Sequence, residues 1–313
     1  RRFLGTQFCT GKKMSSLTLN PWLKKNFGCK VYKISLSTGC TCPNRDGKLS
    51  YGGCTFCSEG GSGEFGQSSG TIEQQIENAI TRVSKKLPKT KEVKFIAYFQ
   101  SFTNTYETET NTFEKLSAIF TAAASDPKIC ALSIGTRPDC LTDRMIDFLS
   151  QLNKIKPVWV ELGLQTIHEA TAAKINRGYT LEVFNAAYKK LKAKKLAVIV
   201  HVILWLPGET KEMMESTARY LAALTPPLDG IKFQLLQILR NTKMAEDYAR
   251  QPWPLPALDE YCTFVKHLAD LMPETTVLHR LTGDGPKALL IEPAWCANKR
   301  LVLNTLKKYF NFE

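Results

Sequence analysis

Short runs rich in Val, Ile and aromatic residues alternate along this chain with longer segments whose apolar residues recur every three or four positions. The short runs are typical of buried strands, and the longer segments are typical of helices with one apolar face. The predicted strands cover residues 31–36, 93–99, 131–135, 158–164, 196–204 and 230–238. The predicted helices between them cover residues 71–87, 111–125, 141–153, 181–195 and 209–224. Thr142 is the predicted N-cap of the third helix, since its hydroxyl can accept a bond from the first turn.

This alternation predicts an α/β fold built on a parallel sheet with right-handed crossovers. Six strands are too few to close an eight-stranded barrel, so we expect a partial (βα)6 barrel of the TIM type. In such sheets, the loops that follow the strands meet at one rim, and ligands bind there. The loop after the first predicted strand contains a cluster of cysteines, which therefore lies at that rim.

The pattern changes after residue 240. A proline-rich segment at 251–259 precedes a predicted helix at 260–272, a strand-like run at 276–283 and a helix at 299–310. We therefore predict a boundary near residue 240, with a core domain over 19–240 and a small C-terminal α/β extension, or cap domain, over 241–313. Residues 1–18 are predicted to be an N-terminal extension, because regular patterning begins only near residue 19.

Composition and charge indicate the kind of partner and the cellular compartment to expect. The formal net charge is +13, which a solvated basic surface would explain, although it also favours a polyanionic partner. The sequence contains no apolar run of the length that a membrane helix needs, so no membrane span is predicted. No secretory signal pattern is visible near the start, so we expect a reducing, cytoplasmic setting, where clustered cysteines bind metals or act in catalysis more often than they form disulfides.

Four of the ten cysteines lie between positions 40 and 57. Cys42, Cys54 and Cys57 have the spacing C-x11-C-x2-C, and three thiolates suit a [4Fe–4S] cluster that leaves one iron open to a small molecule. Zinc held by four ligands, with Cys40 as the fourth, remains an alternative. We favour the cluster and interpret Cys40 as its neighbour, and we keep Cys140, near the rim, as a candidate functional thiol. The remaining cysteines are interpreted as ordinary thiols: Cys9, Cys29, Cys130, Cys262 and Cys296.

The loop CPNRDGKLSYGGCTFC after the first strand resembles the cysteine loop of the radical S-adenosylmethionine (SAM) superfamily. Together with NPWLKKNFGCKVYKISL, IGTRPDCL, VELGLQT, INRGY, LPGE and HRLTGDGPK, it resembles the YtqA/YhcC group, which is related to the radical SAM domain of the Elongator catalytic subunit. The likeness extends from about residue 19 to the C-terminus. It implies that Cys42, Cys54 and Cys57 bind a [4Fe–4S] cluster and that SAM binds the fourth iron through its amino and carboxylate groups.

The resemblance also implies SAM contacts after the second strand. Gln100, Ser101, Thr103 and Asn104 stand where related enzymes have a glycine-rich stretch that contacts the SAM amino group. The departure from glycine leaves this contact open. Arg137, after the third strand, is interpreted as a structural clamp on the rim loops or as a ligand contact.

Further expected contacts lie on the fourth and fifth strands and their loops. Glu161 and Gln165 are expected to point to the rim, with Gln165 where relatives bind the SAM ribose. Arg177 stands where relatives pair with the SAM carboxylate, and His201 where they place an acidic group on the ribose. Trp205 replaces an expected glycine, so we predict that its indole narrows the site or shifts the adenine pocket. A structural role remains open for each of these residues.

In the C-terminal extension, His279, Arg280, Asp284 and Lys287 are candidates for contacts with the substrate or a nucleic acid. The alternative is that this segment is only a packing cap.

The chemistry implied by the resemblance is reductive. An electron from a flavodoxin- or ferredoxin-like donor would lead to cleavage of SAM, and the resulting 5′-deoxyadenosyl radical would take a hydrogen atom from the substrate. The kinship implies a tRNA substrate and, more specifically, trimming of a carboxymethylaminomethyl wobble uridine to its aminomethyl form. The alternatives are a radical SAM enzyme for a small molecule or protein, a zinc-binding nucleic-acid module without enzymatic activity, and an iron–sulfur carrier.

Overall fold

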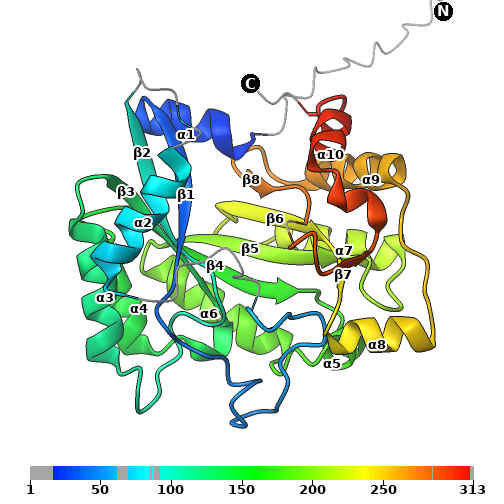
Figure 1. Cartoon of the computed structure of the whole chain (residues 1–313), viewed down its shortest axis with the longest axis horizontal. Coiled ribbons are helices and arrows are strands. Elements are labelled where there is room, and N and C mark those ends of the chain that lie inside the picture. Colours follow the sequence, from blue (N-terminus) through cyan, green and yellow to red (C-terminus); the bar gives the residue numbers. More distant parts are fainter. Residues whose placement is uncertain (1–16, 62–69, 85–86, 88–91, 284, 311–313) are drawn as a thin grey trace, which may run out of the picture.

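The structure is a computed structural model that describes residues 17–61, 70–84, 87, 92–283 and 285–310. Cys9, almost all of the predicted N-terminal extension, and Asp284 lie outside the described residues. Figure 1 shows the order of the elements along the chain. The strands are β1 (Lys30–Leu36), β2 (Val93–Phe99), β3 (Ile129–Thr136), β4 (Val158–Gln165), β5 (Ala197–Leu204), β6 (Gly230–Leu235), β7 (Ile238–Leu239), β8 (Val277–Arg280) and β9 (Leu290–Glu292). The α-helices are α1 (Leu19–Phe27), α2 (Ile72–Ser84), α3 (Phe113–Ser125), α4 (Asp143–Leu152), α5 (Glu169–Lys174), α6 (Leu181–Ala193), α7 (Lys211–Ala222), α8 (Lys243–Arg250), α9 (Leu258–Leu271) and α10 (Lys299–Leu306).

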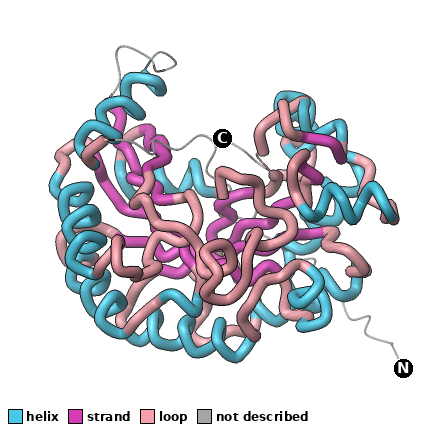
Figure 2. The backbone as a smooth tube through the Cα atoms, turned by 60° about the horizontal axis from the view of Figure 1, so that its bottom comes forward, coloured by secondary structure: helices cyan, strands magenta, loops and turns pink. Residues whose placement is uncertain are grey.

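The main sheet has the strand order β1-β2-β3-β4-β5-β6-β8, and every neighbouring pair is parallel. The sheet is curled, and the helices lie on its outer side (Figure 2). The α/β fold and the partial, open barrel predicted from the sequence are therefore confirmed. The predicted cap is confirmed too, since the Thr142 hydroxyl accepts a bond from the Met145 amide at 3.2 Å.

The number of strands differs from the prediction, because the barrel sheet has seven strands rather than six. The seventh, β8, comes from the C-terminal segment and pairs with β6, with Ile231 opposite Leu278. A strand pattern shows that a segment is extended but not which sheet it joins. The division of the chain between residues 240 and 241 stays a prediction.

The predicted strand at 230–238 is also interrupted. β6 ends at Leu235, and β7 then pairs in the antiparallel direction with β9, with Leu239 opposite Leu290. The run of apolar residues continues across this break, so hydrophobicity could not locate it. The Gln237 side chain at the break accepts a hydrogen bond from the Gly285 amide at 2.7 Å, which ties the turn to the loop after β8.

Three short helices, α1, α5 and α8, were not predicted. α1 covers the end of the barrel at which the strands begin, where its Leu23 is buried and Trp22 packs edge-on against Trp159 with ring centroids 5.6 Å apart. A helix at this end seals the barrel from below, so the open end is the one at which the strands finish.

Strand residues alternate between two environments, as the pleat requires. Residues on the outer face, such as Ile34, Val160 and Phe233, pack against the helices in the main hydrophobic core. Residues on the inner face form layers. The lowest layer is apolar and consists of Val31, Ile96, Ala131, Trp159 and Ile199. The layer above it is polar, and it forms the floor of the cavity described next.

None of the helices in the described ranges is both long enough and apolar enough to cross a membrane.

Candidate active site

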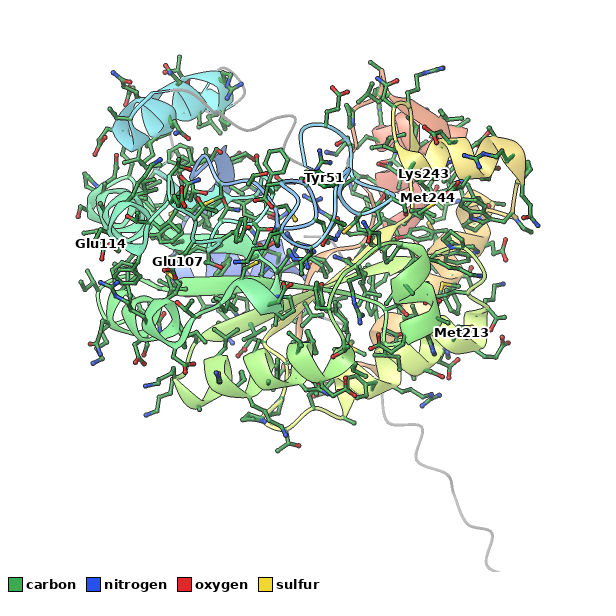
Figure 3. All side chains as sticks on the ribbon, turned by 90° about the horizontal axis from the view of Figure 1, so that it is seen from below. Tyr51, Glu107, Glu114, Met213, Lys243 and Met244 are labelled. Carbon is green, nitrogen blue, oxygen red and sulfur yellow. The ribbon has the colours of Figure 1, made fainter. Side chains whose placement is uncertain are left out.

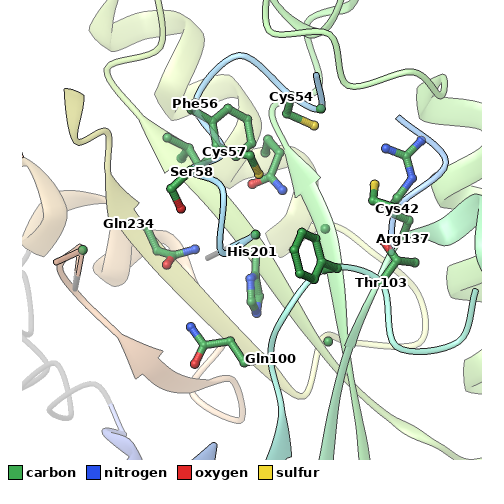
Figure 4. A pocket seen from close by; sticks show the side chains of 18 of the residues that line it. Cys42, Cys54, Phe56, Cys57, Ser58, Gln100, Thr103, Arg137, His201 and Gln234 are labelled. Carbon is green, nitrogen blue, oxygen red and sulfur yellow. The ribbon is translucent and has the colours of Figure 1, made fainter. Parts of the chain in front are cut away.

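A cavity of about 230 Å³ opens at the carboxyl ends of the barrel strands. The cysteine loop that follows β1 lies over one side of it, and segments that follow β2, β3, β4, β6 and β8 supply the rest (Figure 4). Most of the residues singled out from the sequence line this one cavity: Cys42, Cys54, Cys57, Gln100, Thr103, Glu161, Gln165, Arg177 and His201. Ser101 and Asn104 are not among the lining residues.

The cysteine loop is anchored to two distant parts of the chain. The Thr55 amide donates to the Ile175 carbonyl at 3.0 Å, and the Met244 amide at the start of α8 donates to the Thr55 carbonyl at 2.8 Å. The Asn176 side chain donates to the Gly53 carbonyl at 2.8 Å. Figure 3 shows Tyr51, in the same loop, on the face of the molecule that also carries Lys243 and Met244. The unpredicted helices α5 and α8 thus position the loop.

The three cysteines of the loop face the cavity together. A hydrogen bond with Cys57 and burial hold the pKa of the Cys54 thiol well above its ordinary value, and negative charge on Cys57 or Cys42 would raise it further. Thiols that disfavour each other's ionisation need a cation to become thiolates, so this donor set fits an iron–sulfur cluster. Within the described part of the chain, no three Cys, His, Asp or Glu side chains are already placed to hold a metal ion.

Cys40 and Cys140 lie in different surroundings. The Cys40 thiol is buried against the carbonyls of Asn104 and Tyr106, at 4.0 and 3.6 Å, and burial raises its pKa. Cys140 is also buried, and burial followed by the charge of Asp139 raises its pKa well above the ordinary range. Neither thiol lines the cavity, which supports the interpretation of Cys40 as a neighbour rather than a ligand.

The segment after β2 contains a backbone feature that the sequence did not reveal. Phe102 has φ of 56°, a left-handed conformation that glycine adopts most easily. One position of this segment therefore has a backbone conformation that glycine adopts most easily, although the segment contains no glycine. It brings Gln100 and Thr103 to the cavity. Asn104 has a structural role, because its side chain donates to the carbonyls of Phe99 and Gly135 at 3.0 and 2.9 Å.

Gln165 sits at an irregularity at the end of β4. The pairing register with β5 shifts between Gly163 and Gln165, and Gln165 has φ of 69°. Its side-chain oxygen is buried, faces the cavity and has no hydrogen-bond partner among the described residues. A buried acceptor without a partner costs free energy, so it indicates that a ligand donates to it. A SAM ribose hydroxyl fits this requirement.

The two rim arginines act as clamps in this structure. Arg177 is almost fully buried and donates to the carbonyls of Tyr179, Leu164 and Thr166 at 2.8, 3.2 and 2.7 Å. Its remaining nitrogen contacts the Glu169 carboxylate at 3.2 Å. Arg137 pairs with Asp139 at 2.7 Å and donates to the Arg177 carbonyl at 2.9 Å. The guanidinium of Arg177 is thus engaged by the protein itself, so a contact with the SAM carboxylate stays a prediction that these bonds do not favour.

The floor of the cavity is a buried ionic cluster centred on Glu161. Its carboxylate accepts bonds from Lys33 at 2.7 Å, Ser133 at 2.5 Å and His201 at 2.7 Å, and it also contacts the Lys232 ammonium. Burial alone would raise the pKa of Glu161, but the charges of Lys232 and Lys33 outweigh it and hold the pKa well below its ordinary value. Glu161 therefore stays ionised, and it points to the floor rather than to the rim.

The partners of Glu161 were the main omission from the sequence prediction. Lys33, Ser133 and Lys232 all lie within predicted strands, at alternate positions that face the interior of the barrel. That signal was available from the period-two pattern. Burial and then the charge of Lys232 lower the pKa of His201 to about 4, so this imidazole is neutral near pH 7.

The prediction that Trp205 narrows the site is wrong. Trp205 does have φ of 64°, which explains why glycine would suit the position. Its indole, however, packs on the outside of the barrel against Tyr261 and Phe264 of α9, with ring centroids 5.8 and 5.3 Å away. The side chain therefore leaves the cavity open.

Of the C-terminal candidates, Arg280 lines the cavity and donates to the Gln234 side-chain oxygen at 3.4 Å. His279 is buried below the floor, edge-on to Trp159 at 5.4 Å between ring centroids. Lys287 is not among the lining residues.

A parallel partial barrel with three cysteines from its first loop over the open end defines the radical SAM class of enzyme. Residues 36–221 match the Radical SAM superfamily, and residues 228–311 match the Radical_SAM C-terminal domain. The chain therefore belongs to the radical SAM superfamily and is a SAM-dependent enzyme of the iron–sulfur type.

Its relatives place it in the YtqA/YhcC-like group. It is 40% identical to YtqA of Bacillus subtilis over 93% of this chain and 88% of that protein. It is 30% identical to YhcC of Escherichia coli over 92% of this chain and 90% of that protein. The fold is similar to that of an archaeal Elp3 from Methanocaldococcus infernus, with a TM-score of 0.62 and 18% identity, over 89% of this chain and 62% of that one.

Two more distant relatives match only part of the chain. A tRNA uridine(34) acetyltransferase of Methanocaldococcus jannaschii is 25% identical over 54% of this chain and 31% of that protein. Elongator complex protein 3 of Schizosaccharomyces pombe is 23% identical over 58% of this chain and 34% of that protein.

Proposed function

We propose that this enzyme binds a [4Fe–4S] cluster through Cys42, Cys54 and Cys57 and uses it with SAM to modify a tRNA wobble uridine. The observation that carries the proposal is the convergence of these three thiols, with the partnerless Gln165 oxygen, on one cavity at the open end of the barrel. When bound, the cluster supplies an electron that cleaves SAM to methionine and a 5′-deoxyadenosyl radical. The residues of this chain bind, orient and shield the reactants.

The cavity residues have distinct tasks in this proposal. Gln165 accepts a hydrogen bond from the SAM ribose, and Gln100 and Thr103 contact the SAM amino group from the segment shaped by Phe102. The neutral His201 adjoins the ribose and is oriented by Glu161. Arg137 and Arg177 hold the rim loops in place, which keeps the cysteine loop at the correct distance from the strands.

The substrate assignment depends on different support. The distant relatives include a protein that acts on tRNA uridine(34), and the net charge of +13 suits a polyanion. We propose that the enzyme trims a carboxymethylaminomethyl uridine to its aminomethyl form. The carbon between the amine and the carboxylate would be oxidised by two electrons, which SAM takes up on cleavage to methionine and 5′-deoxyadenosine, and water would release the two-carbon group as glyoxylate. A flavodoxin- or ferredoxin-like protein would supply the electron in a reducing, cytoplasmic setting.

The decisive experiment is anaerobic reconstitution with iron and sulfide, followed by addition of SAM and dithionite. We expect release of 5′-deoxyadenosine by the wild type and at most background release by Cys54→Ala. The matched control is Cys130→Ala, which removes a thiol at the opposite end of the barrel and should retain the wild-type rate. Equal release by wild type and Cys54→Ala would refute the ligand assignment.

The substrate is tested with tRNA that carries carboxymethylaminomethyl uridine, and the nucleosides are analysed by mass spectrometry. We expect conversion to aminomethyl uridine that requires SAM and Cys54. Release of 5′-deoxyadenosine that is indifferent to tRNA, with no change in the nucleosides, would leave a radical SAM enzyme for a small molecule or protein. Bound zinc without SAM cleavage would indicate the zinc-binding module instead.

A further inference from the structure

Among the described residues, the charges at the floor of the cavity do not balance. Two lysines, Lys33 and Lys232, share the single carboxylate of Glu161, and both are largely buried, with side chains 20% and 3% exposed. Burial lowers the pKa of each lysine, which shows that this floor is a poor place for further positive charge. His201 adds no negative charge that could compensate.

Arg280 nevertheless adds a third cation to this floor. It lies on β8 opposite Lys232 of β6, and its charge is one reason why the pKa values of Lys33, Lys232 and His201 are lowered. Its one hydrogen-bond acceptor in the described structure is the neutral side chain of Gln234, at 3.4 Å. Across the described ranges, no Asp or Glu lies within ion-pair distance of Arg280, and an arginine cannot relieve the repulsion by losing its proton.

A cation that lines a cavity, has no carboxylate partner among the described residues and is repelled by its neighbours is well suited to bind an anion that enters the cavity. Arginine presents parallel N–H donors that match the two oxygens of a carboxylate. Gln234 can donate from its amide nitrogen to the same anion while its oxygen orients Arg280. Hydrogen bonds to a charged group are among the stronger ones in proteins, so this pair can select for charge as well as shape.

We infer that Arg280, oriented by Gln234, binds a carboxylate on the substrate. This inference rests on the proposed function and deepens it. It predicts that the enzyme binds a substrate that ends in a carboxylate more tightly than an otherwise identical neutral substrate. Arg280 is a specificity-determining residue in this account, and the cluster around Glu161 holds the positive field behind it.

SAM is a second possible source of a carboxylate, and the experiment below separates the two sources. Figure 4 shows Gln234 across the cavity from Cys42 and Arg137. Arg280 is bonded to Gln234 and therefore lies on that far side. Cys57 and Ser58, however, lie on the same side of the cavity as Gln234 in this view, so the SAM carboxylate and a substrate carboxylate are distinguished by experiment.

The test compares two ligands with the reconstituted enzyme: 5-carboxymethylaminomethyluridine and its neutral carboxamide. We expect the wild type to bind the carboxylate roughly 10- to 100-fold more tightly, as for one hydrogen-bonded charge pair. Arg280→Gln should lose that preference, and Arg280→Lys should retain part of it. The matched control, Arg219→Gln, removes a charge from an exposed ion pair on α7 and should behave like the wild type.

Two further readouts separate the sources and the hypotheses. In Arg280→Gln, SAM affinity should fall far less than the affinity for the carboxylate ligand, and circular dichroism shows whether the variant is folded. A tenfold loss of SAM affinity with an intact ligand preference would assign Arg280 to SAM and overturn the inference, as would a wild-type preference in Arg280→Gln.

Failure of the proposed tRNA substrate has a different signature. In that case neither nucleoside binds the wild type, but N-methylglycine, used as a minimal carboxylate probe, still binds in a manner that depends on Arg280. If neither the nucleosides nor N-methylglycine bind the wild type, the carboxylate site itself is refuted.

Discussion

Replacement of Glu161 by Gln tests whether the buried ionic cluster holds the barrel together. Glu161 is fully buried and is the single anion between Lys33 and Lys232. The substitution keeps the size and one acceptor oxygen but leaves two buried ammonium groups facing each other. Removal of one partner from a buried charge pair costs about 3–5 kcal/mol. Because domains of this kind are stable by only ~5–15 kcal/mol, we expect Glu161→Gln to lose a large part of the free energy of unfolding.

The assay is urea unfolding of the reconstituted protein at neutral pH, followed by circular dichroism. The control is Glu92→Gln, because Glu92 pairs with Lys94 at 3.6 Å and is 73% exposed; such exposed pairs contribute below about 1 kcal/mol. The double variant Glu161→Gln with Lys232→Met removes the more deeply buried ammonium and should recover much of the loss, since Lys33 is partly hydrated. A loss no larger than that of Glu92→Gln, or a double variant less stable than the single one, would refute the reasoning.

Two further predictions concern His201 and Gln165. The pKa of His201 is about 4 in the folded protein, against an ordinary value of 6.5. Between these two pH values, the unfolded state binds a proton that the folded state does not bind. The neutral His201 side chain therefore contributes its full share of the stability above pH 6.5, and this share is lost as the pH falls toward 4. Between pH 7 and pH 5, wild type should therefore lose about 2 kcal/mol more than His201→Gln in urea unfolding, and parallel losses would contradict the assignment. Gln165→Leu removes a buried acceptor that has no partner in the described structure, so we expect unchanged or slightly higher stability but SAM binding weaker by roughly 3- to 10-fold in equilibrium dialysis. Equal SAM affinity in both proteins would remove Gln165 from the ribose site.

The parts of the site that the sequence predicted share one property: they depend on order along the chain. Cys42, Cys54 and Cys57 follow the first strand of a parallel sheet, and that fact alone puts them at the rim of the barrel. Gln165 is the last residue of β4, and Gln100 directly follows β2. Because the strands of a parallel barrel all end at the same rim, residues that follow them lie close together in the fold.

The parts that were missed or misjudged depend on where a side chain points. Arg177 and Asn104 lie at the rim, but their side chains donate hydrogen bonds to backbone carbonyls. A sequence motif does not show which acceptor a side chain contacts. Trp205 occupies a left-handed backbone position that turns its indole toward α9 instead of the cavity. Residue type and spacing do not encode this choice, because it depends on which neighbour offers a buried apolar surface.

By itself, the sequence determined the α/β class, the parallel order of the strands and the convergence of the cysteine loop with the strand ends, because hydrophobic periodicity and chain connectivity restrict these strongly. Tertiary structure decided the rest. It made β8 the seventh strand of the barrel rather than part of a separate sheet. It also placed Arg280 beside Lys232 and beside Gln234, which lies 46 positions earlier in the sequence. The charged side chains of the cavity floor lie on different strands and come together only when those strands pair. The sequence alone therefore does not predict how their charges interact.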